Sequence, residues 1–174
     1  MDRGFSLIEV LVATTVTTIA TLALAQLCVM STRANQDARV TTLATVLASQ
    51  KMEQLRALAW TSDALGLPIS DLATDTTVVP HSSSGGTGLS PSPPGTLRVS
   101  TPGYCDFLDE NGRSLGGGTA PPSSTAFVRR WAIAAGAADT LAIQVSVIRI
   151  GSPSAAGTVR RPGEVRLVGI RARK

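Results

Sequence analysis

Residues 4–13 read Gly-Phe-Ser-Leu-Ile-Glu-Val-Leu-Val-Ala, and they open the most apolar part of the chain. From Val10 to Thr32 the sequence contains no Asp, Glu, Lys or Arg. A helix of about 20 such residues is long enough to cross the hydrocarbon core of a membrane. Glu9 is placed one turn into this helix, where an ionised carboxylate without a partner is unfavourable, so we predict a functional role for it. The alternative is that Glu9 simply lies at the headgroup boundary.

The same stretch closely resembles the class III signal of type IV prepilins and pseudopilins: a Gly, a Phe, three mostly small or apolar residues and a Glu. The resemblance implies that a prepilin peptidase cuts between Gly4 and Phe5 and methylates the new amine of Phe5. It also implies that Glu9 meets the amine of a neighbouring subunit in a filament, which would offset the desolvation of both charges. The Ala-Leu-Ala triplet at 23–25 would also permit an ordinary signal peptide, but the residue order from Gly4 to Glu9 argues against it.

The helix is predicted to continue from about Phe5 to about Trp60, because no Gly or Pro interrupts the chain between Phe5 and Leu65. Beyond the apolar stretch, apolar residues recur every three or four positions with charged residues between them, which is typical of a helix packed on one side. The apolar residues are Val40, Leu43, Val46, Leu47, Met52, Leu55 and Leu58, and the charged ones are Arg39, Lys51, Glu53 and Arg56. Two helices with a bend near residues 31–35 are the alternative.

Strand patterns follow in the C-terminal part, at residues 96–100, 127–134, 141–150 and 164–171. We therefore predict an α+β fold of the pilin type, in which the long helix packs on a small antiparallel sheet of three or four strands. Residues 136–139 and 151–157 are predicted connections, and Asn111-Gly112 is a predicted turn. The segment 81–95, HSSSGGTGLSPSPPG, is predicted as a mobile loop that contributes nothing to a core.

The predicted organisation has five segments. Residues 1–4 form a leader peptide, 5–32 the transmembrane half of the helix and 33–60 its amphipathic half. Residues 61–125 form a loop region rich in Ser, Gly and Pro with a short strand, and 126–174 the antiparallel strand region. The leader implied by the resemblance is cytoplasmic, so the chain is expected to be a single-pass protein of the bacterial inner membrane with a periplasmic C-terminal domain. The positive-inside rule favours the opposite orientation, since Arg3 is outnumbered by Arg33, Arg39 and Lys51.

Composition restricts the other possibilities. The 174 residues carry a net charge of +4, which is too small an excess for a dedicated nucleic-acid binder. Aromatic residues make up 3%, so aliphatic side chains must fill the core, with Trp60 and Trp131 predicted between helix and sheet. Cys28 lies in the apolar segment and Cys105 far along the chain, and no disulfide between them is expected.

Three groups of polar residues were candidates for a site. His81 is the only histidine and stands beside serines 82–84, but we predict a simple loop residue. An acidic group suggests calcium, but Phe107 stands where an EF-hand loop needs its first ligand, so we predict a solvated turn. That group is Asp106, Asp109, Glu110 and Asn111. A calcium site of another type is the alternative, because some members of the pseudopilin family that the chain resembles bind calcium. The basic end would suit DNA or acidic lipid, but it lacks interleaved aromatics and is predicted as a solvated strand and tail. Its residues are Arg160, Arg161, Arg166, Arg171, Arg173 and Lys174.

The sequence therefore predicts a non-enzymatic structural subunit, a minor pilin or pseudopilin, without catalytic residues, cofactor or metal. Residues 47–58 and 127–148 further resemble pilus-modification minor pilins and the I-type pseudopilins of type II secretion. The expected partners are the prepilin peptidase, other pilin or pseudopilin subunits, an inner-membrane assembly platform and membrane lipid, but not nucleic acid. A binding minor pilin for DNA uptake or adhesion and a membrane-anchored enzyme are the alternatives. A pilus, a type II secretion system and a competence apparatus all remain compatible with the sequence.

Overall fold

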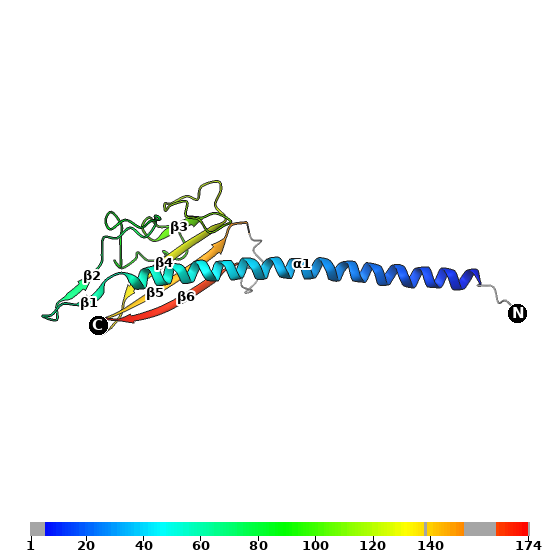
Figure 1. The fold of residues 1–174 in the computed structure, drawn as a ribbon, viewed down its shortest axis with the longest axis horizontal. Helices are drawn as coiled ribbons and strands as arrows, with labels where there is room; N and C mark the ends of the chain where they lie inside the picture. Colours follow the sequence, from blue (N-terminus) through cyan, green and yellow to red (C-terminus); the bar gives the residue numbers. More distant parts are fainter. Residues whose placement is uncertain (1–5, 138, 152–162, 174) are drawn as a thin grey trace. The chain divides into compact units, whose positions relative to one another are not determined.

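The computed structural model describes residues 6–137, 139–151 and 163–173. Helix α1 runs without interruption over Leu7–Ala57, so the alternative of a bend near residues 31–35 is wrong. The strands that follow are β1 (Trp60–Ser62), β2 (Pro68–Ser70), β3 (Cys105–Leu108), β4 (Phe127–Ala135), β5 (Thr140–Arg149) and β6 (Val165–Ala172) (Figure 1). The chain divides into two compact units, Met1–Arg39 and Val40–Lys174, each described by itself below. The predicted α+β fold is confirmed.

The second unit packs the last part of α1 on a four-stranded antiparallel sheet of order β3-β4-β5-β6. Each strand pairs with the next one along the chain, so the predicted meander is correct. A separate hairpin, β1–β2, follows the helix (Figure 1). Alternate residues of the strands, such as Trp131 on β4 and Val145 on β5, are fully buried and form one core with α1.

One face of α1 enters this core. Its buried residues are spaced by one, three or four positions: Ala44, Leu47, Ala48, Lys51, Met52 and Leu55. Val46 falls outside this face and is 47% exposed, so its predicted role in packing is wrong. Lys51 was predicted among the exposed charged positions, yet it is only 1% exposed. Gly169 of β6 permits the close approach of the helix, since a Cβ there would lie 3.2 Å from Sδ of Met52.

The three long strands agree with the prediction to within one residue at each end, but the predicted strand at 96–100 is wrong. That segment is a turn, in which the N–H of Arg98 donates to the carbonyl oxygen of Gly95 at 2.7 Å. Strands β1, β2 and β3 were not predicted, because three or four residues are too few to show a periodic pattern.

The segment 81–95 was predicted to contribute nothing to a core, and this prediction is wrong. Leu89 is 1% exposed within it, and the N–H of Ser92 donates to the carbonyl oxygen of Ile133 on β4 at 2.9 Å. Both other predicted turns that lie in the described part are confirmed. Gly112 has a φ of +78° in the turn that begins at Asp109, and Gly136 starts the β4–β5 connection. The predicted connection at 151–157 lies almost entirely outside the described residues.

Candidate functional site

The beginning of α1 is the part of the candidate site that the structure describes. Ser6 precedes the first helical residue, and its N–H donates to Oε2 of Glu9 at 3.0 Å, while its carbonyl oxygen accepts the N–H of Glu9 at 3.0 Å. The first N–H groups of a helix have no partner within it, and a carboxylate three residues later satisfies one of them. The carboxylate of Glu9 therefore has a hydrogen-bond partner within its own chain. Gly4 and Phe5, the predicted cleavage and methylation residues, lie outside the described residues.

The first unit presents an apolar helix with nothing packed on it in the described part of the chain. Every residue of α1 from Leu7 to Arg39 is exposed, including large side chains such as Leu24 at 62%. The most apolar 18-residue window has a mean hydropathy of 2.0 and is not buried at all. By length and composition this helix is able to cross a membrane.

Threonine hydroxyls interrupt the apolar surface, and each one that the structure describes here is satisfied within the helix. Oγ1 of Thr17 donates to the carbonyl oxygen of Ala13 at 2.7 Å, and Oγ1 of Thr18 to that of Thr14 at 2.7 Å. Thr14, Thr15, Thr21 and Thr32 make the same kind of bond one turn back. A hydroxyl bonded in this way does not need water, so these residues are compatible with a lipid environment.

The comparison with protein families bears directly on this segment. Residues 1–25 match the prokaryotic N-terminal methylation motif. This motif is the class III signal of type IV pilins, and it covers Gly4, Phe5 and Glu9 together with the first apolar turns of α1. It supports a type IV pilin-like substrate of prepilin peptidase, anchored in a membrane by the apolar helix. No curated protein and no solved structure matches the chain.

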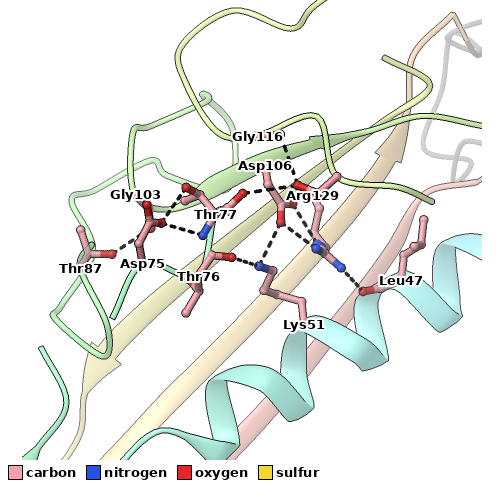
Figure 2. A network of polar contacts seen from close by, with 11 residues as sticks. Leu47, Lys51, Asp75, Thr76, Thr77, Thr87, Gly103, Asp106, Gly116 and Arg129 are labelled. Atoms are coloured by element: carbon pink, nitrogen blue, oxygen red, sulfur yellow. Dashed lines mark hydrogen bonds and ion pairs between the residues drawn. The ribbon is translucent and has the colours of Figure 1, made fainter. Parts of the chain in front are cut away.

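A group of buried charged side chains lies in the core of the second unit, and it was not predicted from the sequence. Lys51 of α1 and Arg129 of β4 both bind the carboxylate of Asp106 on β3 (Figure 2). Nζ of Lys51 lies 3.0 Å from Oδ2 of Asp106, and the guanidinium of Arg129 binds both carboxylate oxygens, at 2.9 and 2.7 Å. All three side chains are at most 6% exposed. We call these three residues the buried ion network.

The buried ion network connects four segments of the second unit. Nη1 of Arg129 donates to the carbonyl oxygen of Leu47 on α1 at 2.9 Å, and Nζ of Lys51 donates to that of Thr76 at 2.5 Å (Figure 2). Thr76 is itself buried, in a loop where the carboxylate of Asp75 accepts the N–H of Thr77 at 2.8 Å. A single carboxylate thereby joins the helix, two strands and this loop.

Lys51 is the electrostatically unfavourable member of the network. Burial lowers its pKa from 10.5 to about 8, although Asp106 partly opposes this effect, and the charge of Arg129 lowers it further. Its ammonium also lies 4.2 Å above the ring centre of Trp131, a favourable cation–π contact. Two cations thus share one carboxylate, so the loss of Asp106 would remove the ion-pair partner of both.

Two patterns in the sequence could have indicated two members of the network. Lys51 is four residues from both Leu47 and Leu55, so it lies on the apolar stripe of α1 rather than beside it. Arg129 alternates with Phe127 and Trp131 along β4, which places it on the same buried face. Neither pattern identifies the shared partner, because Asp106 lies on a four-residue strand that was not predicted.

The acidic group that might have suggested calcium is not assembled. Asp106 is 1% exposed and belongs to the buried ion network, which corrects its predicted place in a solvated turn. Asp109 uses Oδ1 within its own turn, accepting the N–H groups of Asn111 at 2.9 Å and Arg113 at 2.8 Å. Within the described ranges, no three His, Cys, Asp or Glu residues are grouped to hold a metal ion. His81 is exposed on a loop, as predicted.

Two residues of the basic end, Arg171 and Arg173, are bound to their own chain, which corrects the prediction that they are solvated. Nη1 of Arg171 donates to the carbonyl oxygen of Leu58 at 2.7 Å. The guanidinium of Arg173 lies 3.7 Å from the ring centre of Trp60 and donates to the carbonyl oxygens of Thr61 and Ile69. These contacts fasten β1–β2 to the end of β6. Arg160, Arg161 and Lys174 lie outside the described residues.

Proposed function

We propose that this chain is a minor pilin or pseudopilin, a non-enzymatic structural subunit of a filament assembled from the bacterial inner membrane. The methylation motif at residues 1–25 is the observation that carries the proposal. It begins a helix whose apolar surface has no packing partner among the described residues, as expected of a subunit that exchanges lipid for neighbouring helices. The second unit, with its own core, is then the periplasmic domain.

In this proposal a prepilin peptidase cuts between Gly4 and Phe5 and methylates the amine of Phe5. The new amine is one helical turn from Glu9, whose carboxylate already caps the start of α1 through the N–H of Ser6. On assembly, the carboxylate of Glu9 binds the amine of a neighbouring subunit, which fixes the axial register of the two helices. The partners are the peptidase, other pilin or pseudopilin subunits, the assembly platform and lipid.

Mass spectrometry of protein extracted from membranes tests the processing step. The expected first residue is N-methylated Phe5, and Gly4→Val should block the cut without changing membrane insertion, because a side chain at that position obstructs the peptidase. Ala64→Val is the control, since Ala64 is exposed in the hairpin turn of the second unit and already carries a side chain. Recovery of intact Met1, or of a chain cut after Ala25, from wild-type cells would reject the proposal.

The binding minor pilin for DNA uptake or adhesion gains no support from the described residues. Its basic end would have to be available, but Arg171 and Arg173 bind carbonyl oxygens of their own chain. The structural subunit therefore stands as the proposal.

A further inference from the structure

The two edges of the main sheet differ. At the β3 edge, the returning segment around Leu115 pairs with the strand: the N–H of Phe107 donates to the carbonyl oxygen of Gly116 at 2.9 Å, and the N–H of Leu115 donates to that of Phe107 at 2.8 Å. The N–H of Asp109 likewise donates to the carbonyl oxygen of Arg113 at 3.0 Å. This edge is closed by the chain itself, which is how soluble proteins protect a sheet against unwanted pairing.

The β6 edge is open. Antiparallel pairs alternate between those that exchange backbone hydrogen bonds and those that do not. The N–H of Arg173 donates to the carbonyl oxygen of Asp139, so the backbone groups of the odd-numbered residues before it face β5. The groups of the even-numbered residues therefore face away from the sheet, and in the described part of the chain no backbone partner binds them. These residues are Arg166, Val168, Ile170 and Ala172.

The side chains of the same four residues lie on the face of the sheet opposite α1. Val168 is 64% exposed and Ile170 73%, the largest exposures of apolar residues on the sheet. Their neighbours on β5 are Gln144 and Ala142, and neither provides a large apolar side chain to cover Val168 or Ile170. The free row of N–H and C=O groups and the exposed apolar pair thus coincide on one strand.

Among the described residues, the β6 edge lacks the usual protections of an edge strand. β6 has eight residues, contains no Pro and pairs with β5 in an unbroken register without a bulge. Arg171 and Arg173, which might have repelled another strand, turn back onto the carbonyl oxygens of Leu58 and Thr61. Arg166 alone projects on the outer face, where its contact is with the side chain of Gln144.

We infer that the β6 edge is a docking site for an extended segment of another protein, which adds to the sheet as a fifth strand. Strand addition obtains affinity from main-chain hydrogen bonds and selectivity from alternate side chains. The docked segment of the other protein has apolar residues beside Val168 and Ile170 and a carboxylate that reaches Arg166. A second copy of β6 is the less favourable occupant, because the strand itself carries Arg166 and Arg171 and no carboxylate, and Glu164 lies outside it.

The test uses the full chain in lipid nanodiscs and a displayed library of random nine-residue peptides. Selected peptides should alternate apolar and polar residues and contain at least one Asp or Glu. Val168→Pro should weaken their binding about tenfold or more, because proline removes an outward N–H while its backbone angle suits an edge strand. Val168→Thr is the matched control: it keeps the N–H and the branched shape, and its binding should stay near wild type.

Arg166→Glu provides a second, independent arm that leaves the backbone unchanged, and it should weaken the same peptides about tenfold or more by charge reversal. Near-ultraviolet circular dichroism of Trp60 and Trp131 verifies that each variant is folded. The inference is overturned if no peptide is selected, or if the selected peptides bind folded Val168→Pro or Arg166→Glu as well as wild type. A dimer of the chain that Val168→Pro abolishes would also overturn it, in favour of a second copy at this edge.

Discussion

The carboxylate of Asp106 lies 3.0 Å from the ammonium of Lys51, and both side chains are 1% exposed. The contact joins two residues 55 positions apart, one on the helix and one on a short edge strand. Arg129 binds the same carboxylate through two nitrogens, so one negative charge is shared by two cations. Asp106 is therefore the carboxylate that both buried cations contact, whereas Asp75 acts on the pKa of Lys51 only as the smallest of the contributing causes.

Asp106→Asn should be strongly destabilising. The substitution keeps the shape but removes the carboxylate that Lys51 and Arg129 both contact, and breaking such a buried pair costs about 3–5 kcal/mol. Denaturant unfolding of the chain in micelles, followed by the signal of its two tryptophans, measures the free energy of unfolding of the second unit. Asp109→Asn is the matched control, because its amide oxygen still accepts the N–H groups of the turn, and it should cost about 1 kcal/mol or less. Equal losses for both variants would contradict the role assigned to the network.

Lys51 should make the stability of the second unit depend on pH. Its pKa is about 8 in the folded chain against an ordinary 10.5, so between these values the unfolded chain binds more protons. The free energy of unfolding should therefore increase as the pH rises from about 8 towards 10, by up to about 3 kcal/mol for the full shift. Below pH 8 this residue should contribute no slope.

Lys51→Met should remove that slope. Met has a similar length, packs well against Trp131, and leaves the pair of Asp106 and Arg129 intact. At pH 7 we expect the free energy of unfolding to change by about 1 kcal/mol in either direction. The lost hydrogen bond to Thr76 opposes the gain from removing a buried charge. A slope between pH 8 and 10 that persists in Lys51→Met would show that another group titrates.

The guanidinium of Arg173 should hold the β1–β2 hairpin in place. Arg173→Met removes the bonds to Thr61 and Ile69 and the stacking on Trp60, at a cost of about 1–3 kcal/mol. Limited proteolysis should then cut the hairpin near Leu65 at a higher rate. Arg149→Met, which loses only an exposed contact of 4.0 Å with Glu110, should leave the cleavage rate unchanged.

Glu9→Ala should separate assembly from processing. Cleavage after Gly4 and membrane insertion should stay nearly normal, because Ala is apolar and favours a helix. Crosslinking to other filament subunits should fall by about two orders of magnitude or more, since a neighbouring amine is then buried without a partner. Glu9→Gln is the informative control: its side chain can still accept the N–H of Ser6, so it preserves the helix cap and removes only the charge. Normal incorporation of both variants would mean that Glu9 is only an interfacial residue.

The sequence by itself determined the features that depend on neighbouring residues. The charge-free run from Val10, the unbroken helix and the three long strands all follow from hydrophobic periodicity, and the structure places them within two or three residues of their predicted ends. The motif at residues 1–25 can also be identified directly, because it is a continuous stretch of sequence.

Only the tertiary structure decided which side chains meet. Lys51, Asp106 and Arg129 come from three segments with no local signal of one another, and Leu89 enters the core from a stretch whose composition indicates a loop. β6 and the residue that follows it show the same dependence, since Arg173 is bound to the hairpin while Val168 stays exposed on the strand. The physical reason is that periodicity reports which face of an element is buried, whereas pairing of charges and closure of sheet edges depend on contacts between residues far apart in the chain.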